Sequence, residues 1–243
     1  MAVGLVRISA AIAACLLPLL LSAQTVSKQV IPLWPNGAPG AQGNAEADRP
    51  TLTIFPATGD NKTATGVVVF PGGGYSHLAT GHEGVQIAAW LNKLGISAFM
   101  LEYRLGPKYH YPVELWDAQR AIRYVRAHAG EYGVRADRIG VWGFSAGGHL
   151  ASTAGTHFDN GDANGADAID KQSSRPDFLI LAYPVITFEE PYAHLGGPVG
   201  RLAEGARIPV AANARVRNRN FRPSQIFYNF ITIKCPVGAF TLR

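Results

Sequence analysis

The chain has 243 residues, of which 47% are hydrophobic and 16% are charged, and its formal net charge is +5. This composition excludes an intrinsically disordered chain, and the absence of any internal repeat or Gly-X-Y period excludes solenoid and collagen-like proteins. The length fits one domain or at most two. A net positive charge suggests nucleic acid or an anionic surface as a partner, so its distribution along the chain has to be considered first.

The charge lies at the carboxyl-terminal end of the sequence. Residues 24–195 contain 13 basic and 16 acidic residues, whereas residues 196–243 contain 8 basic residues and a single acidic one, Glu204. No histidine follows His194 and no aspartate follows Asp177. The body of the protein is therefore slightly acidic, and its basic character belongs to a segment of different composition.

Residues 1–23 are predicted to be a secretory signal peptide. Arg7 supplies the positive start, an uncharged apolar run covers Ile8 to Leu21, and Leu21-Ser22-Ala23 ends in small residues that suit a signal peptidase. The apolar run is short for a membrane span of about 20 residues, so no membrane association is expected after cleavage. A buried amino-terminal helix is the structural alternative.

The two cysteines support the same interpretation. Cys15 lies inside the apolar run, where Ile12-Ala13-Ala14-Cys15 loosely resembles a lipoprotein acylation box, which is a further alternative. Cleavage after residue 23 leaves Cys235 as the single cysteine, so the mature chain cannot form an internal disulfide. We expect a secreted or periplasmic protein of bacterial type.

The body of the chain alternates predicted strands and helices after a loop rich in Gly, Pro and Ala over residues 35–50. Apolar runs rich in β-branched residues predict strands at Leu52–Phe55, Gly66–Phe70, Ile96–Leu101, Arg138–Trp142 and Phe178–Tyr183. Helical spacing and terminal Gly or Pro predict helices at Gly84–Leu94, Pro112–Ala129 and from Ala146 to Thr153. This alternation predicts an α/β fold, with a mainly parallel sheet covered by helices on both faces.

The strongest chemical motif is Gly143-Phe144-Ser145-Ala146-Gly147-Gly148, between a predicted strand and a predicted helix. It matches the G-x-S-x-G nucleophile elbow, in which a sharp turn exposes the serine hydroxyl at the carboxyl end of a strand. Small residues two positions before and after the serine allow the strand and the helix to approach closely. Ser145 is therefore the candidate nucleophile, against the alternative of a structural Gly-rich turn.

A second motif, Pro71-Gly72-Gly73-Gly74-Tyr75, follows the first buried strand. Acyl transfer needs backbone N–H donors that point at the developing oxyanion, and consecutive glycines let the backbone approach without side-chain collisions. We expect Gly73, Gly74 and Ala146 to be these donors. A flexible hinge or a phosphate loop is the alternative, but no G-K-[ST] sequence follows.

These motifs make the chain resemble α/β-hydrolases of the esterase and lipase type. More narrowly, it is similar to secreted bacterial acetyl-xylan and feruloyl esterase-like proteins, often described as xylanase-associated. The resemblance covers residues 30–194 and includes PGGGY at 71–75, GHEG at 81–84, EYRLGP at 102–107, RIGVWGFSAGGHLAST at 138–153 and AYPVITF at 182–188. It implies removal of acyl groups, often acetyl, from plant-wall polysaccharides or small esters, with no cofactor.

Other polar residues are given structural interpretations. Tyr75, His82 and Glu83 are candidate pocket residues, and the last two are expected to order a loop near the pocket. Arg104 and Asp117 are expected to form a salt bridge or structural hydrogen bonds, and His149 is expected to be a packed histidine rather than a base. No HExxH or CxxC motif is present, so no metal site is predicted.

The triad acid and base of a serine hydrolase are not found. In this fold the chain order is Ser, then Asp or Glu, then His, and the acid and base follow later strands. Downstream of Ser145 the histidines are His149, His157 and His194, all too early for the base. Apart from a period-two apolar pattern at 226–233, residues after 194 show no convincing strand or helix.

We therefore divide the chain into a signal peptide (1–23), an α/β-hydrolase core (24–194) and an atypical basic tail (195–243). The tail is hypothesised to be out of frame, replacing a missing carboxyl-terminal third. A natural basic tail that binds nucleic acid is the rival interpretation, not adopted as a partner here. The hypothesis predicts an unpaired sheet edge after Phe178–Tyr183, poor solubility and little turnover of p-nitrophenyl acetate. A prolyl-oligopeptidase-like peptidase and a non-catalytic degenerate hydrolase are the functional alternatives.

Overall fold

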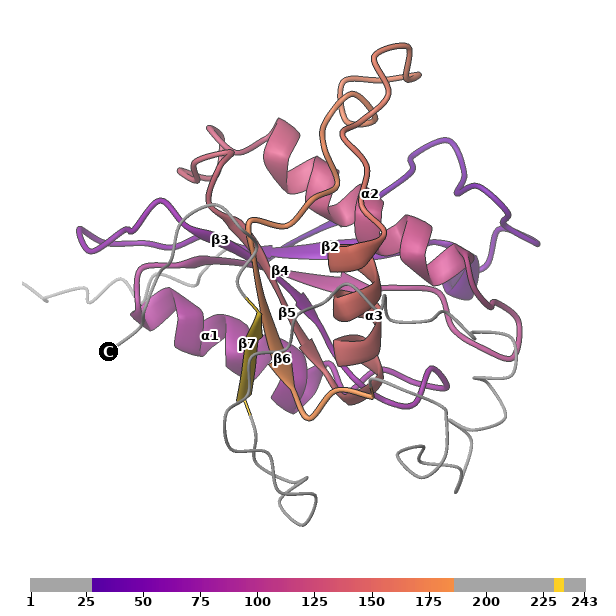
Figure 1. Ribbon diagram of the computed structural model, residues 1–243, viewed down its shortest axis with the longest axis horizontal. Helices are drawn as coiled ribbons and strands as arrows, with labels where there is room; N and C mark the ends of the chain where they lie inside the picture. Colours follow the sequence, from indigo (N-terminus) through magenta and orange to yellow (C-terminus); the bar gives the residue numbers. More distant parts are fainter. Residues whose placement is uncertain (1–27, 186–229, 234–243) are drawn as a thin grey trace, which may run out of the picture.

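The computed structural model describes residues 28–185 and 230–233, which contain a single seven-stranded sheet (Figure 1). The predicted signal peptide lies outside the described residues, as does the predicted basic tail except for residues 230–233. The strands are β1 (Gln29–Pro32), β2 (Thr51–Phe55), β3 (Gly66–Phe70), β4 (Ser97–Glu102), β5 (Ile139–Phe144), β6 (Phe178–Ala182) and β7 (Phe230–Ile233). The helical segments are η1 (Glu46–Asp48), η2 (Gly81–Val85), α1 (Gln86–Lys93), α2 (Val113–Ala127) and α3 (Ser145–Thr156).

The strand order across the sheet is β1-β2-β4-β3-β5-β6-β7. The central strands β4, β3, β5 and β6 are parallel, whereas β1, β2 and β7 are attached antiparallel at the two sides. The carboxyl ends of β3, β5 and β6 therefore meet at one edge of the sheet. This is the edge at which open α/β sheets build their sites, and it carries both sequence motifs.

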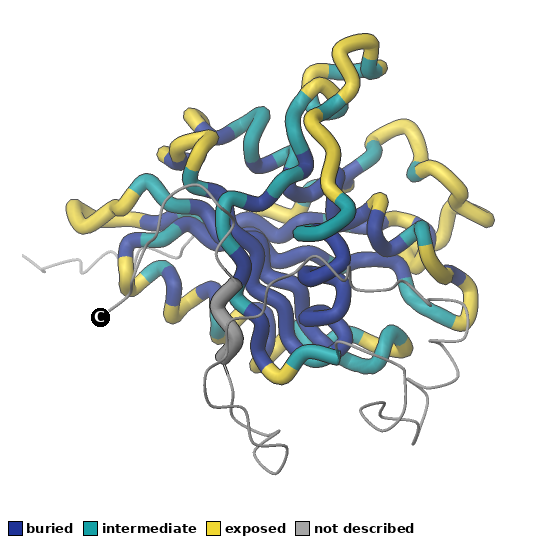
Figure 2. Tube along the Cα trace, in the orientation of Figure 1, coloured by how far each residue is buried: buried dark blue, intermediate teal, exposed yellow. Residues whose placement is uncertain are grey.

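Helices cover both faces of the sheet, as predicted. α1 packs on one face, and α2 and α3 pack together on the other (Figure 1). Within β3, Val68 and Phe70 belong to the core under α2 and α3, whereas Val67 and Val69 belong to the core under α1. Because both faces are covered, every residue of β3 is buried, which explains its uninterrupted apolar sequence (Figure 2).

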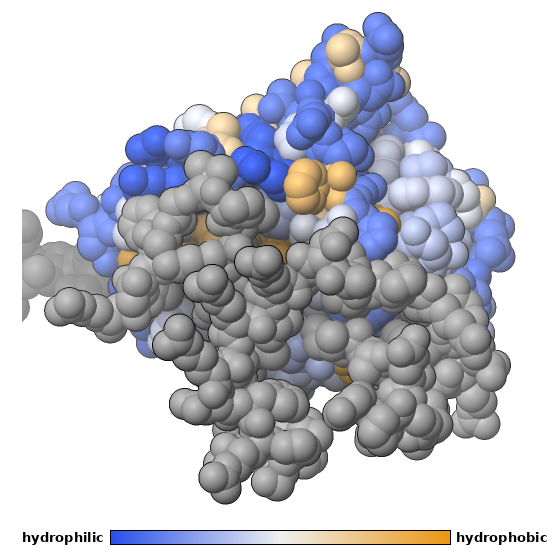
Figure 3. Space-filling view, viewed as in Figure 1, coloured by the Kyte–Doolittle hydropathy of each residue, from blue (hydrophilic) through white to orange (hydrophobic). Residues whose placement is uncertain are grey.

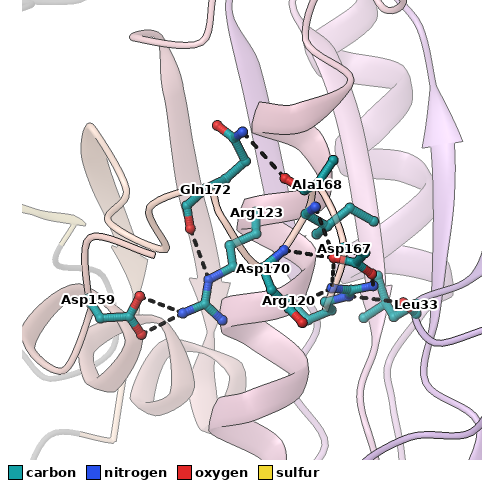
Figure 4. Close-up of polar contacts among 9 residues, drawn as sticks. Leu33, Arg120, Arg123, Asp159, Asp167, Ala168, Asp170 and Gln172 are labelled. Carbon is teal, nitrogen blue, oxygen red and sulfur yellow. Dashed lines mark hydrogen bonds and ion pairs between the residues drawn. The ribbon is translucent and has the colours of Figure 1, made fainter. Parts of the chain in front are cut away.

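The segment between α3 and β6 is held against α2 by a row of arginines one helical turn apart (Figure 4). Arg120 donates to Asp167 at 2.5 and 2.9 Å and to Asp170 at 2.6 Å, and Arg123 donates two 2.5 Å hydrogen bonds to Asp159. This segment forms the mainly hydrophilic projection at the top of Figure 3. Three aspartates of this segment are thus paired with arginines of α2.

Two features of the sheet differ from the sequence prediction. β1 was not predicted, because its four residues lack an apolar pattern and end at Pro32. The sheet was predicted to end unpaired after Phe178–Tyr183, but β7 pairs antiparallel with β6. The strand lies within the apolar alternation noted at 226–233, in the segment hypothesised to be foreign, and it is β7 rather than β6 that forms this side of the described sheet.

Candidate active site

Ser145 lies at the junction of β5 and α3, and its backbone is in the left-handed region, with a φ of +49°. A non-glycine residue in this region costs on the order of 1–3 kcal/mol, so the surrounding structure has to impose the turn. The two motif glycines allow it. A Cβ on Gly143 would lie 2.2 Å from the carbonyl oxygen of Gly147, and a Cβ on Gly147 would lie 2.2 Å from that of Phe70. The predicted strand–turn–helix context of the nucleophile elbow is therefore present.

The glycine loop after β3 packs directly on this elbow. A Cβ on Gly72 would lie 3.0 Å from the Cβ of Ser145 and 2.8 Å from the carbonyl oxygen of Phe144. Gly73 and Gly74 follow with positive φ angles of 131° and 63°. At Gly72 the loop therefore packs so closely on the candidate nucleophile that a side chain would not fit, and a Cβ on Gly73 would lie 2.1 Å from the carbonyl oxygen of His77 within the loop itself.

Two of the candidate oxyanion donors, Gly73 and Gly74, follow Gly72 in the loop that packs on the serine, and the third, Ala146, is the next residue after it. Among the described residues, the N–H groups of Gly73 and Gly74 donate no hydrogen bond, while the carbonyl oxygen of Gly73 accepts from Ser76 and His77 at 3.1 and 3.3 Å. Ala146 is in the first turn of α3, where helix N–H groups have no acceptor within the helix. The glycine loop and the start of α3 thus adjoin Ser145, and the assignment of Gly73, Gly74 and Ala146 as oxyanion donors stays a prediction.

Tyr75 and His149 connect the glycine loop to the helix that follows the serine. The Tyr75 hydroxyl lies 2.8 Å from Nδ1 of His149, and the two rings meet edge to face. Burial lowers the pKa of His149 to about 4 and raises the pKa of Tyr75 well above its ordinary value. The imidazole is therefore neutral and packed at neutral pH, in agreement with the structural interpretation of His149.

Glu83 is buried beside the glycine loop, and His82 is not. Oε2 of Glu83 accepts the N–H of Gly72 at 2.6 Å, and Oε1 accepts the hydroxyl of Tyr183 at 2.6 Å. The His82 side chain is 70% exposed and approaches Glu83 only to 3.7 Å. Both residues were predicted to order a loop near the pocket, whereas Tyr183, which follows β6 at the same edge of the sheet, carries no sequence signal for this contact.

The described histidines make contacts that do not include a serine–histidine catalytic pair. His77, His128 and His157 hydrogen-bond to residues within four positions of themselves, at Ser76, Tyr124 and Thr156. His149 bonds to Tyr75, His82 faces Glu83, and His110 lines a small cavity together with Tyr75 and His149. The acid and base that the sequence search did not find are thus not supplied by these contacts, and residue 194 lies outside the described residues.

Within residues 28–185 and 230–233, no group of three or more His, Cys, Asp or Glu side chains is arranged to hold a metal ion. In the same part of the chain, none of the helices combines the length and the apolar character needed to cross a bilayer.

The family of the chain follows from a comparison with known protein families. The BD-FAE family model matches residues 52–190, which include the glycine loop, the elbow and β6. The chain belongs to the BD-FAE family. The match also ends within four residues of His194, where the motif resemblance ends.

Relatives of this BD-FAE chain are esterases and xylan-acting enzymes. An acetylxylan esterase of Xylanibacter ruminicola is 38% identical over 151 residues, which are 62% of this chain and 29% of that protein. The endo-1,4-beta-xylanase B of Butyrivibrio fibrisolvens is 37% identical over 126 residues, 50% of this chain and 19% of that protein. This chain therefore spans less than a third of the length of these curated relatives.

A solved structure resembles the BD-FAE chain over a larger share of its length. The acetyl ester-xyloside bifunctional hydrolase from Caldicellulosiruptor lactoaceticus is 46% identical, with a TM-score of 0.60 over 67% of this chain and 59% of that one. An esterase from Thermogutta terrifontis is 26% identical, with a TM-score of 0.54 over 73% of this chain and 61% of that one. The predicted α/β-hydrolase fold and the esterase resemblance are confirmed.

Behind the glycine loop, a cavity of about 20 Å³ is lined in part by Tyr75, His149 and Glu114. It has room for about one water molecule, so it is too small for an ester substrate. Glu114 is buried at its wall. Burial, with a smaller contribution from the neighbouring Asp117 carboxylate, raises the pKa of Glu114 from 4.5 to about 7.

This buried carboxyl predicts a pH-dependent stability. Because the folded protein holds the Glu114 proton more tightly than the unfolded chain does, stability should fall as the pH rises from 4.5 through 7. Glu114→Gln removes this loss, so the variant should gain about 2–3 kcal/mol over the wild type between about pH 5 and about pH 8.5. Urea unfolding of both proteins at the two pH values measures the change, and a difference that does not vary with pH would contradict it.

Proposed function

We propose that this BD-FAE protein is a serine carboxylic-ester hydrolase that removes acyl groups, chiefly acetyl, from acylated carbohydrate of the xylan type or from small esters. The observation that carries the proposal is the strained elbow at Ser145, with the loop of Gly72 to Gly74 packed on it. A serine on such a turn, beside backbone donors that no described residue accepts from, has the arrangement that acyl transfer requires.

The reaction would proceed through an acyl-serine intermediate. The Ser145 hydroxyl oxygen attacks the ester carbonyl carbon while a base removes its proton, and the N–H groups of Gly73, Gly74 and Ala146 stabilise the resulting oxyanion. Collapse expels the sugar alcohol, and water then releases the acid and frees the serine. Loss of one oxyanion donor costs about 3–4 kcal/mol of transition-state stabilisation in a comparable site.

The substrate class rests on the relatives. One of them is an acetylxylan esterase, another is an endo-1,4-beta-xylanase, and a solved homologue is an acetyl ester-xyloside hydrolase. The slightly acidic body of the protein suits a neutral carbohydrate ester better than a polyanion. We further propose that residues 1–23 direct export to the periplasm or the medium, where such polymers are found.

The activity of this chain depends on an acid and a base that the sequence search did not find. Without them, turnover of p-nitrophenyl acetate should be low compared with a homologue that has a complete triad, although Ser145 and the oxyanion donors can retain some catalysis. The tail hypothesis, with residues 195–243 out of frame, is the proposed cause. Sequencing of the coding DNA tests that hypothesis independently of any activity.

A fluorophosphonate probe tests the proposed function directly. We expect mass spectrometry to find a slowly formed adduct on Ser145 in the folded wild type and none in Ser145→Ala, because the elbow and the oxyanion donors retain some reactivity at the serine when the base is missing. Ser152→Ala, a buried serine on α3 away from the elbow, is the control and should be labelled like the wild type. A folded wild type that is not labelled would support the non-catalytic alternative, and faster cleavage of peptides than of acetyl esters would support the peptidase.

A further inference from the structure

Glu83 connects its own turn with the glycine loop and with a residue that is distant in the sequence. It lies in the π-helical turn η2, its carboxylate is buried, and it accepts one hydrogen bond from the glycine loop and one from the residue after β6. Tyr183 is 100 positions away from Glu83. Because each oxygen of this buried carboxylate accepts from a different segment, Glu83 fixes the position of two segments relative to each other.

The first of these bonds distinguishes the N–H group of Gly72 from those of the two glycines that follow it. The Gly72 N–H donates to Glu83 at 2.6 Å, whereas those of Gly73 and Gly74 have no acceptor among the described residues. A short bond to a carboxylate is about twice as strong as a neutral one, so it fixes the orientation of the Gly72 peptide group. The next two peptide groups are held at their carbonyl oxygens, that of Gly72 by the Ala79 N–H at 2.9 Å and that of Gly73 by the N–H groups of Ser76 and His77. The Glu83 bond anchors the start of the loop that carries the candidate oxyanion donors.

The Glu83 carboxylate also lies close to the candidate nucleophile. The position that a Cβ on Gly72 would occupy is 2.8 Å from Oε2 of Glu83 and 3.0 Å from the Cβ of Ser145. Gly72 is therefore the spacer between the two side chains. Any movement of Glu83 would be transmitted through Gly72 to the elbow.

The second bond holds the segment after β6, which contacts the elbow at Ser145. Tyr183 has a φ of +35°, an unfavourable value for a residue with a side chain, and its hydroxyl donates to Glu83 at 2.6 Å. Burial, then the Glu83 bond, raises the pKa of the Tyr183 hydroxyl, so it stays protonated. Two residues later, the N–H of Val185 donates to the carbonyl oxygen of Ser145 at 3.2 Å.

We propose that Glu83 is a positioning residue of the acyl-transfer site, which aligns the oxyanion donors with Ser145 by holding the Gly72 peptide and Tyr183 at once. This inference rests on the proposed function. Gln in place of Glu83 keeps the shape of the side chain but offers one acceptor and one donor, so Gly72 and Tyr183 cannot both keep their bonds. The glycine loop would then lose its fixed orientation relative to the serine.

The test combines two measurements on the full chain. The first is NMR of the backbone amides in protein labelled with 15N at glycine, and the second is the rate of fluorophosphonate labelling of Ser145. In the wild type, the Gly72 amide proton should resonate far downfield, and in Glu83→Gln it should move upfield and exchange with solvent faster. The rate of Ser145 labelling should fall on the order of 10- to 100-fold, because small misplacements of reacting groups have effects of this size. Glu131→Gln, the same change at an exposed glutamate in the turn after α2, should change neither readout.

A second variant separates positioning from folding. Tyr183→Phe removes one of the two bonds, so it should leave the Gly72 signal in place and slow labelling less than Glu83→Gln does. Thermal unfolding of each variant shows that the protein is folded at the temperature of labelling. If Glu83→Gln does not fold, Tyr183→Phe takes its place. The expected result is then an unchanged Gly72 signal with slower labelling of Ser145, and an unchanged labelling rate would count against the proposal.

The outcomes separate this inference from the proposed function. An unshifted Gly72 signal in Glu83→Gln overturns the proposal, and so does a shifted signal with an unchanged labelling rate, since Glu83 would then only stabilise the loop. A wild type that is folded but unlabelled refutes the proposed function, and with it the positioning role. Coupled loss of the Gly72 shift and of labelling supports the proposal.

Discussion

Gly147→Ala is expected to yield little soluble protein and no fluorophosphonate adduct on Ser145. The added Cβ would lie 2.2 Å from the carbonyl oxygen of Phe70 and 2.5 Å from that of Pro71, and both atoms belong to the backbone at the end of β3. Relief of this overlap requires α3 to move away from the central strand and from the glycine loop. We expect a loss of more than about 3 kcal/mol, a large part of the stability of a typical domain.

Gly130→Ala is the matched control for this substitution. Gly130 lies in the exposed turn after α2, and no atom lies within 4 Å of an added Cβ. This variant should unfold within about 0.5 kcal/mol of the wild type, or be slightly more stable because the unfolded chain loses freedom. Soluble yield, thermal unfolding and Ser145 labelling are compared for the two variants. A Gly147→Ala protein that folds and is labelled like Gly130→Ala would disprove the close packing of the elbow.

The elements of the body could be predicted because their cause is local in sequence. β3 has the predicted bounds, Gly66–Phe70, since a strand covered on both faces needs an unbroken apolar run. The helix predicted from Gly84 is instead a π-helical turn, Gly81–Val85, followed by α1. A Cβ on Gly84 would lie 2.2 Å from Sδ of Met100 in β4, so that glycine serves close packing rather than the start of a helix.

The nucleophile and the glycine loop could also be predicted, because the chemistry requires neighbouring residues of defined type. The elbow needs its small residues within two positions of Ser145, and the loop needs consecutive glycines directly after a strand. The contacts of Glu83 could not be predicted in this way. They depend on the strand order β4-β3-β5-β6, which brings the end of β6 beside the loop after β3.

The net charge of the sequence has a different meaning once the fold is considered. Three arginines of α2 pair with Asp159, Asp167, Asp170 and Asp177 of the described body. These four acidic residues therefore hold a segment of the fold against α2. The excess of basic residues is confined to 196–243, where the described structure comprises only β7.

Asp117→Ala is expected to destabilise the protein by about 3–5 kcal/mol, because it leaves the Arg104 guanidinium buried without its counter-ion. The two side chains are 1% and 0% exposed, and Asp117 accepts the backbone N–H, Nε and Nη2 of Arg104 at 2.6–3.2 Å. The guanidinium also donates to the carbonyl oxygen of Pro39 and lies over the ring of Tyr109. It is therefore fixed in place and cannot reach solvent when its partner is removed.

A double variant shows whether the loss comes from the unpaired charge. Arg104→Met combined with Asp117→Leu replaces the pair by apolar groups of similar size, and should recover most of the stability lost in Asp117→Ala. Asp137→Ala is the control, since its pair with Arg135 is more than half exposed on both sides and should contribute less than about 1 kcal/mol. Urea unfolding of the four proteins provides the comparison. If the double variant is as unstable as Asp117→Ala, charge compensation is not the cause of the loss. The pair would then stabilise the protein through the specific hydrogen bonds that join Arg104, after β4, to Asp117 on α2.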